Sequence, residues 1–411
     1  MRRVVITGAG VVSSLGDTPA GLHAALCEGH SGLSPVGLFD AAGLGCPLGG
    51  EVKDFDAYRY LGRRNLRPLD RTSRLVASAA QLALEDSGWT KEARAKQEVG
   101  LVLGTMFCSV RTIAEFDRRA LEAGPAYASP MDFANTVINA AAGQTAILHD
   151  LRGVNTTVSA GLTSGLQALC YAADLIRSGG ARALLAGGAD ELCFESFYGF
   201  ERAGLLCRSD VDEGHYSVPF DTRRNGFTPG EGAALLMLEE AASARERGAL
   251  VLAEVCGCGS GYDCSRGRDE VKAVESVAHS MRFALYDAGM LPYEVECLSA
   301  SANGSLRGDR WESRAVAQVF GDHARRMPLA GVKAMLGETL GASGALQAVD
   351  ALETMRDGVL PGIAGLEQVE EGFPLAPVGP GSQDVDAVNV LVNSVGLDGH
   401  SCSLVVARCD G

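Results

Sequence analysis

The feature that most constrains the fold of this chain is a repeated alternation of short β-branched runs with longer amphipathic segments. Strand-like runs lie at residues 4–10, 99–103, 155–158, 183–186, 233–238, 251–255, 296–302, 387–392 and 403–406. Helical periodicity lies between most of them, at residues 70–87, 110–121, 134–148, 162–176, 270–288, 311–320 and 342–355. Strands that alternate with helices predict an α/β protein with buried, mainly parallel sheets.

The alternation runs through the chain twice and divides near residue 250. We therefore expect two related halves, residues 1–248 and 249–411. No stretch of linker-like composition separates them, so the halves are expected to pack as one unit. The helix after the first strand is expected to be capped by Asp17, a residue type that is common at helix N-termini.

Charge and hydropathy argue against several classes of function. The 411 residues carry a formal net charge of -15, and the basic residues are scattered singly or in pairs, which argues against nucleic acid as a partner. The first residues lack the apolar core of a signal peptide, and no run of about 18 apolar residues indicates a membrane span. We therefore expect a cytoplasmic protein with no membrane partner.

Residues 155–169, NTTVSAGLTSGLQAL, predict a strand, a tight elbow and a helix N-terminus. Enzymes use this arrangement to present a nucleophile beside free backbone N–H groups that stabilise an oxyanion. The residue at the crest of the elbow is Leu162, whose side chain has neither a lone pair nor an exchangeable proton. The sequence therefore indicates either an active site elsewhere or one that has lost its nucleophile.

Two other patterns do not predict a bound cofactor or metal. The run Gly8-Ala9-Gly10 follows a strand but lacks the third glycine of a dinucleotide-binding loop, so nucleotide binding is not expected. Cys256, Cys258 and Cys264 are close in sequence, but no histidine lies nearby. Their spacing favours small apolar residues in a strand and the following loop over a metal site.

Six segments, taken in order, resemble motifs of the β-ketoacyl-acyl carrier protein synthases. They are VVITGAGVVSSLG, NTTVSAGLTSG, PFDTRRNGFTPGEGAA, ASANGSLRGD, VKAMLGETLGASGA and NSVGLDGHSCSLVVA, and they extend over nearly the whole chain. The resemblance implies the thiolase fold, with five layers (αβαβα) made from two related halves. It also implies dimers in which the sheets of two subunits join across a two-fold or pseudo-two-fold axis.

Active members of this family use one cysteine and two histidines, and the resemblance places all three positions in this chain. The cysteine position falls on Leu162, the first histidine position on Asn303 and the second on Glu338, while an accompanying lysine is retained as Lys333. In active members the cysteine takes the acyl chain as a thioester, and the histidines assist decarboxylation and stabilise the enolate. Loss of all three implies that this chain alone has no catalytic residues for acyl transfer.

This pattern resembles the chain length factors, the β subunits of type II polyketide synthases. The resemblance implies a non-catalytic subunit that forms a heterodimer with a catalytic ketosynthase and shapes the tunnel that limits polyketide length. The substrate would be carried on the phosphopantetheine arm of an acyl carrier protein. Carrier proteins are acidic, so docking is expected on the catalytic subunit rather than on this acidic chain.

The resemblance also implies a product class and a set of tunnel residues. Better-known aromatic-polyketide members have glutamine at the cysteine position, so Leu162 favours a subunit that serves reduced or polyene chains. Tunnel positions fall on the helix near residues 110–121. They are Val110, Ile113 and Asp117, with Phe116 in place of Asp117 if the register shifts by one. Val110 and Ile113 are smaller than the aromatic residues often found there, which favours a longer or wider tunnel.

A glycine-rich loop near the C-terminus, containing Val395, Leu397 and His400, is placed at the pocket by the resemblance. The N–H groups of Leu162 and Leu397 would form the oxyanion hole. His400 is the histidine closest to this pocket in the motifs. No histidine of the chain is expected to belong to a cysteine, histidine and aspartate constellation.

Alternative roles are open for the degenerate positions. Glu338 and Lys333 form either a structural salt bridge, which their placement around one loop favours, or a new acid/base pair. Asn303 is expected to hydrogen-bond its own loop. A ketosynthase-like enzyme with a repurposed site would use Glu338, Asn303 or Cys108 for ester or amide formation, although Cys108 lacks an elbow and a histidine partner. The other alternative is a homodimer that binds an acyl ligand without turnover.

Overall fold

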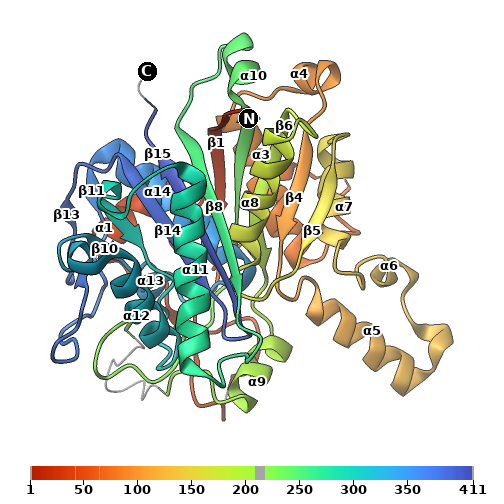
Figure 1. Cartoon of the computed structure of the whole chain (residues 1–411). Helices are drawn as coiled ribbons and strands as arrows, with labels where there is room; N and C mark the ends of the chain where they lie inside the picture. Colours follow the sequence, from red (N-terminus) through yellow and green to blue (C-terminus); the bar gives the residue numbers. More distant parts are fainter. Residues whose placement is uncertain (1, 42, 64, 209–217, 410–411) are drawn as a thin grey trace.

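The computed structural model describes residues 2–41, 43–63, 65–208 and 218–409 (Figure 1). Five strands of the first half lie side by side. In spatial order they are β1 (Val4–Val12), β7 (Gly232–Glu240), β6 (Ala183–Asp190), β4 (Gly100–Gly104) and β5 (Asn155–Val158). β7 is antiparallel to both β1 and β6, whereas β4 is parallel to both β6 and β5.

The second half repeats this order of strands. Its strands, in spatial order, are β8 (Ala253–Tyr262), β15 (His400–Ala407), β14 (Asn389–Val395), β9 (Cys297–Ser299), β10 (Pro328–Ala330) and the short edge strand β12 (Ala376–Pro377). β15 is antiparallel to β8 and β14, and the remaining neighbours are parallel. β1 and β8 pair over two residue pairs, which joins the two halves into one eleven-stranded sheet.

The expectation of mainly parallel sheets is wrong. Among the described residues, five of the ten pairings in the large sheet are antiparallel. β14 and β15 are consecutive strands joined by the short turn at residues 396–399, and a short turn forces antiparallel pairing. Because helices cover these strands, their composition is apolar throughout and does not reveal the strand direction.

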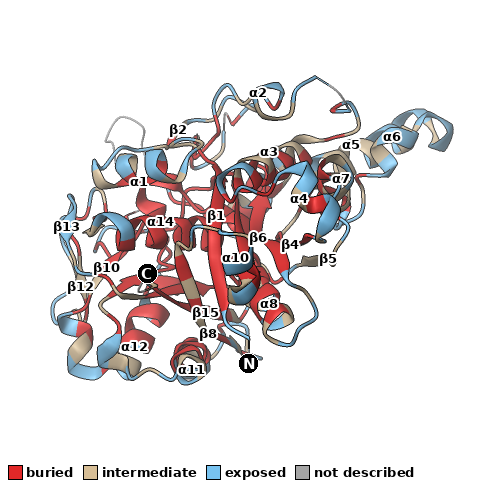
Figure 2. Ribbon diagram, turned by 90° about the horizontal axis from the view of Figure 1, so that it is seen from above, coloured by how far each residue is buried: buried red, intermediate tan, exposed pale blue. Residues whose placement is uncertain are grey.

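Six helices form three layers around the sheets. They are α3 (Arg71–Asp86), α7 (Ala140–His149), α8 (Ser164–Arg177), α11 (Glu270–Ala288), α12 (Gly308–Phe320) and α14 (Ser343–Asp357). α3 and α7 cover the outer face of the first half, and α11 and α12 cover that of the second. α8 and α14 contact each other and strands of both halves, and α14 is buried from Ser343 to Met355 (Figure 2). This is the thiolase-like α/β fold that the sequence predicts.

The remaining elements are short or peripheral. They are α1 (Pro19–Cys27), α2 (Tyr58–Leu61), α4 (Lys91–Lys96), α5 (Val110–Ala123), α6 (Pro130–Phe133), α9 (Phe194–Arg202), α10 (Ala241–Glu246), α13 (Lys333–Leu336), β2 (Ser34–Pro35), β3 (Leu48–Gly49), β11 (Val359–Leu360), β13 (Gln383–Asp384) and short 3-10 turns. The expected boundary between residues 248 and 249 lies between α10 and β8. Within the described ranges, no helix has both the length and the apolar character that crossing a bilayer requires.

The start of α1 differs from the expectation. Thr18, not Asp17, is the N-cap, and its hydroxyl accepts a hydrogen bond from the N–H of Gly21. The Asp17 carboxylate instead accepts a hydrogen bond from the Tyr60 hydroxyl at 2.8 Å. Both residue types are good caps, and Pro19 at the first helical position fixes the start of the helix one residue later.

α5 and α6 form an arm, residues 110–139, that projects away from the body of the molecule (Figure 1). Several large apolar side chains on the arm and on the neighbouring α7 are exposed, namely Leu121, Tyr127, Met131, Phe133, Val137, Ile138 and Ile147. Single exposed apolar residues are ordinary on protein surfaces, but a contiguous stretch of this kind is typical of a surface that another protein covers.

Candidate functional site

The strand, elbow and helix expected around Leu162 are present as β5, residues 159–163 and α8. Gly161 has φ of +59°, and a Cβ atom there would lie 2.5 Å from Oδ2 of Asp398. The Ser164 hydroxyl donates to the carbonyl oxygen of Gly161 and accepts from the N–H of Ala160, and the Thr163 hydroxyl donates to the carbonyl oxygen of Ala160. The elbow is therefore held by its own side chains and does not depend on a nucleophile.

Leu162 occupies the crest of the elbow as an apolar side chain that is 5% exposed. It belongs to a buried cluster that includes Leu192, Phe200, Phe227 and Leu340, with Met106, Phe107 and Leu397 packed against it. Burial of a leucine of this kind stabilises a fold by about 1.5–3 kcal/mol relative to exposure. Leu162 thus fills the elbow as a core residue would.

Asn303, Lys333 and Glu338 meet in one buried cluster. The Lys333 ammonium lies 2.9 Å from Oε2 of Glu338, so the expected salt bridge is confirmed. Oδ1 of Asn303 accepts from the N–H of Ser305, which confirms the expected bond to its own loop. Nδ2 of Asn303 also donates to Oε2 of Glu338 at 2.8 Å. The sequence did not reveal this contact, because 35 residues separate the two side chains.

The Glu338 carboxylate is surrounded by hydrogen-bond donors. Oε2 accepts from Asn303 and Lys333, while Oε1 accepts from the N–H of Leu340 and the hydroxyl of Ser343. Glu338 is 0% exposed and Lys333 is 4% exposed. A carboxylate that is fully buried and accepts four hydrogen bonds is poorly placed to take a proton from a substrate.

The space beside Asn303 is small. A cavity of about 10 Å³ is bounded by residues that include Asn303, Glu312, Val395 and Leu397, which is room for about one water molecule. Oε2 of Glu312 has no hydrogen-bond partner, and burial raises the pKa of this carboxyl group to about 7. Within the described residues, this cavity is too small for an acyl chain.

The loop with Val395, Leu397 and His400 lies at this cavity only in part. Val395 and Leu397 line it, whereas His400 contacts Asp398 at 3.0 Å and its ring packs on Tyr262. Among the described residues, the N–H groups of Leu162 and Leu397 have no protein acceptor. The donors of the expected oxyanion hole are therefore free, and the side chain at the crest between them is the apolar Leu162.

Asp190 fixes the loops on two sides of this region. Its carboxylate accepts hydrogen bonds from the Thr105 hydroxyl, from the N–H groups of residues 106–108 and from the N–H of Gly341. Residues 105–108 lead into α5, and Gly341 lies three residues after Glu338. One buried side chain thus ties the base of the arm to the Glu338 loop.

The expected tunnel positions lie on α5. Val110 and Ile113 are half-buried, Phe116 packs on Phe133 with ring centroids 5.9 Å apart, and Asp117 is exposed. A role in a tunnel that two subunits enclose stays a prediction, since one chain shows only its own side of it.

Cys108 is placed badly for a nucleophile. It is 1% exposed, and burial raises the pKa of its thiol to about 11.

The three clustered cysteines are also separated by the fold, because Cys256 and Cys258 lie in β8 and Cys264 is exposed beyond it. Among the described residues, no group of three or more histidine, cysteine, aspartate or glutamate side chains is arranged to hold a metal ion.

The expectation that no histidine belongs to a cysteine and aspartate constellation is wrong. His23 lies 2.7 Å from Asp350 and 3.4 Å from Cys27. His23 and Cys27 are four residues apart on α1, a spacing that places side chains on one helix face and that the sequence shows. Asp350 is 327 residues away, and the sequence gives no signal that joins it to them.

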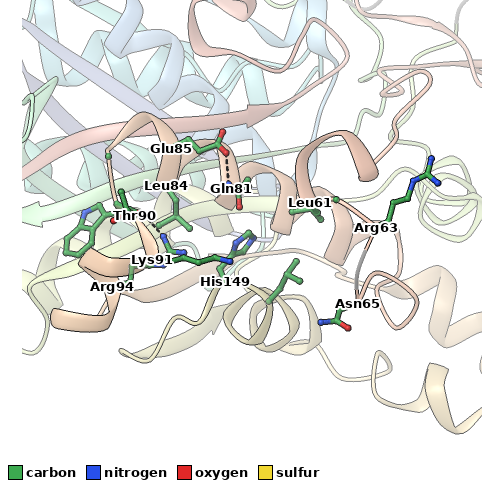
Figure 3. Close-up of a pocket in the computed structure, with 14 residues that line it drawn as sticks. Leu61, Arg63, Asn65, Gln81, Leu84, Glu85, Thr90, Lys91, Arg94 and His149 are labelled. Atoms are coloured by element: carbon green, nitrogen blue, oxygen red, sulfur yellow. Dashed lines mark hydrogen bonds between the residues drawn. The ribbon is translucent and has the colours of Figure 1, made fainter.

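A larger cavity of about 700 Å³ lies elsewhere, between α3, α4 and the end of α7 (Figure 3). Arg63, Lys91, Arg94 and His149 line it, and none of the degenerate catalytic positions or expected tunnel positions does. Its size therefore does not identify it as the site that the sequence predicts.

Comparisons with known proteins identify the family of this chain. Residues 1–244 match the family described as Beta-ketoacyl synthase, N-terminal domain, and residues 252–367 match Beta-ketoacyl synthase, C-terminal domain. The chain is 33% identical to 3-oxoacyl-[acyl-carrier-protein] synthase 2 of Coxiella burnetii, over 99% of each protein. It is 32% identical to the oxytetracycline polyketide putative beta-ketoacyl synthase 1 of Streptomyces rimosus, over 99% of this chain and 97% of that protein.

Solved structures show the same fold. The ishigamide ketosynthase/chain length factor superposes with a TM-score of 0.92 at 31% identity, over 100% of both chains. A type II polyketide synthase ketosynthase in complex with its acyl-carrier protein superposes with a TM-score of 0.89 at 24% identity, which supports the fold alone. With two family domains, full-length relatives and a shared fold, the chain belongs to the β-ketoacyl synthase family.

Proposed function

We propose that this chain is a non-catalytic chain length factor that pairs with a separate, catalytic ketosynthase and forms part of its polyketide tunnel. The observation that carries the proposal is the state of the three catalytic positions. Leu162 is packed in an apolar cluster, and Asn303 and Glu338 are hydrogen-bonded to each other. A group of catalytic residues acts as a unit, so loss of all three leaves the chain dependent on the catalytic residues of a partner.

The edge of the sheet supports a dimer. β5 is the last strand at one end of the large sheet, so its outer edge has no neighbouring strand among the described residues. Such an edge is a template for pairing with a strand of another subunit. The arm and α7, whose exposed apolar residues are named above, lie on the same side of the molecule as β5 (Figure 1). The edge and the arm together fit an interface with a subunit of the same fold.

A catalytic ketosynthase is the partner that this interface fits best. The structural relative named as a ketosynthase/chain length factor shares the full length of this chain. The net charge of -15 disfavours an acidic carrier protein on this surface, so the proposal places carrier docking on the catalytic partner. Within this proposal no cofactor is bound by the chain itself, since the substrate arrives on the phosphopantetheine arm of the carrier.

The test is co-expression with the ketosynthase that is encoded beside it. We expect a stable heterodimer by size-exclusion chromatography, and product chains that become shorter when Ile113→Trp or Val110→Phe narrows the tunnel. Val271→Trp is the matched control, because Val271 is 78% exposed on α11 in the other half of the chain. Turnover of acyl and malonyl carrier protein by the purified chain alone would instead support a repurposed enzyme.

A second measurement separates the proposal from a ligand-binding homodimer. The proposal predicts that the chain takes up the ketosynthase in preference to itself when the two are mixed after separate purification. A homodimer that persists in an excess of the ketosynthase, with product length unaffected by Ile113→Trp, contradicts the proposal.

A further inference from the structure

A thiol, an imidazole and a carboxylate form a chain of contacts outside the degenerate site. Nδ1 of His23 lies 2.7 Å from Oδ1 of Asp350, and Nε2 of His23 lies 3.4 Å from the sulfur of Cys27. His23 is 3% exposed and Asp350 is 1% exposed, whereas Cys27 is half-buried. The buried end of the chain is therefore the carboxylate, and the end that reaches solvent is the thiol.

The fold explains this placement. His23 and Cys27 are one turn apart on α1, so their side chains lie on the same face of that helix. α14 packs against α1 and is buried from Ser343 to Met355, which brings Asp350 to the far side of the imidazole. α1 and α14 come from opposite halves of the chain. α1 provides the imidazole and the thiol, α14 provides the carboxylate, and the ring of His23 lies between the two helices.

Electrostatics favour a charged imidazole in this position. Burial lowers the pKa of His23, but the hydrogen bond to Asp350 and the contact with Cys27 outweigh burial and raise the pKa to about 10. The other ionisable groups near the ring are Glu353 and Asp357 of α14, which are acidic, and both are paired with Arg356. An imidazolium that donates from Nε2 stabilises the thiolate form of a cysteine.

We propose that Cys27 is an activated thiol that accepts an acyl group from a thioester, with His23 as its proton partner and Asp350 as the residue that positions His23. The arrangement follows the logic of nucleophile, base and orienting group that serves acyl transfer in unrelated folds. It is independent of the elbow at Leu162 and of the proposed pairing with a ketosynthase.

The reaction balances without a further reactant. The Cys27 sulfur attacks the carbonyl carbon of the thioester, so a new sulfur–carbon bond forms, and the bond between that carbon and the donor sulfur breaks. The leaving thiolate takes the proton from Nε2 of His23. The products are an S-acylated Cys27 and a free thiol, and no electron is transferred to or from an outside oxidant or reductant.

The chain carries its own reference for a test. Cys264 is exposed, so it reports the reactivity of an accessible thiol in the same sample. An ordinary thiol with a pKa near 8.5 is about 3% ionised at pH 7. Full ionisation increases the reactive fraction roughly 30-fold, and the lower intrinsic nucleophilicity of a thiol that is acidic enough to be fully ionised reduces this gain to about threefold.

The experiment treats the full chain at pH 7 with S-acetyl-N-acetylcysteamine and measures acetylation of each cysteine peptide by mass spectrometry. We expect Cys27 to be acetylated about threefold faster than Cys264 although it is less exposed. The measurement is repeated at pH 6, which gives the pH dependence of the rate at each thiol. A rate at Cys27 equal to or below that at Cys264 overturns the proposal without the need for any variant.

Two variants then test whether His23 and Asp350 raise the reactivity of the Cys27 thiol or only pack beside it. His23→Gln and Asp350→Asn are expected to lower the rate at Cys27 about threefold and to leave the rate at Cys264 unchanged. Circular dichroism confirms that each variant is folded. A folded variant in which Cys27 keeps both its rate and its pH profile contradicts the role of His23. Reaction of Cys27 with iodoacetamide but not with the thioester contradicts the assignment to acyl transfer.

Discussion

The buried Lys333–Glu338 pair predicts that substitution of one member destabilises the chain more than substitution of the other. Removing one member of a buried ion pair costs about 3–5 kcal/mol, because the other member is left buried without its countercharge. Glu338 keeps three donors when Lys333 is replaced by Met, namely Asn303, Ser343 and the N–H of Leu340. Among the described residues, Lys333 keeps neutral acceptors such as the Ser301 hydroxyl at 3.4 Å, but no carboxylate within 4 Å, when the charge of Glu338 is removed.

We therefore expect Glu338→Gln to destabilise the chain more than Lys333→Met. The estimates are about 5 kcal/mol for Glu338→Gln and about 3 kcal/mol for Lys333→Met. In the double variant neither charge is left alone, so its cost should fall below the sum of the single costs by about 1–3 kcal/mol. The measurement is guanidinium-induced unfolding of the three variants and the parent, at one protein concentration and followed by circular dichroism.

Two outcomes would refute this reasoning. Additive costs would show that the pair does not interact, and a smaller cost for Glu338→Gln than for Lys333→Met would show that the remaining donors do not stabilise the carboxylate. If Glu338 instead served as a catalytic base, Glu338→Gln would lower turnover by the heterodimer while leaving the unfolding midpoint unchanged.

Two further predictions follow from buried side chains. Leu162→Ala should lower the free energy of unfolding by about 2–5 kcal/mol and leave product formation by the heterodimer largely intact. A large loss of turnover with the dimer still assembled would instead show a direct role for Leu162. Burial, followed by repulsion from Asp70 and Glu231, raises the pKa of Glu191 to about 8. The folded state therefore binds a proton that the unfolded state releases near pH 4.5, so wild-type stability falls as the pH rises from about 4.5 to about 8. Glu191→Gln should remove this loss, and its stability relative to wild type should rise by up to about 1.4 kcal/mol per pH unit over that window in thermal or chemical unfolding. A difference that does not change with pH would show that Glu191 is not protonated in the folded chain.

Local patterns in the sequence predicted much of the fold. The helix expected at residues 270–288 is α11 with the same bounds, because a long amphipathic run with an N-terminal cap at Asp269 specifies its own ends. The strand and helix around Leu162 were likewise predicted, since β-branched residues, small turn residues and a helical stripe follow in order. The Lys333–Glu338 salt bridge was predictable because both residues belong to one loop.

Features that depend on distant residues were not predictable from the sequence. The direction of β7 depends on how the long connection from β6 crosses the sheet, and buried strands have similar composition in either direction. The contact of Asn303 with Glu338 and that of His23 with Asp350 join separate segments whose approach is set by packing of whole helices. Local competition between two good caps also placed the start of α1 at Thr18 rather than Asp17.

The Asp190 carboxylate has a consequence for motion. It receives the N–H groups of residues 106–108 at the base of the arm and that of Gly341 beyond Glu338, so opening either loop breaks bonds that hold the other. These four amides should therefore exchange their hydrogens with solvent at a common rate, as one cooperative unit. A subunit that immobilises the arm would then slow hydrogen exchange at Gly341 as well. Association at the surface would therefore be detected as slower exchange of a buried amide.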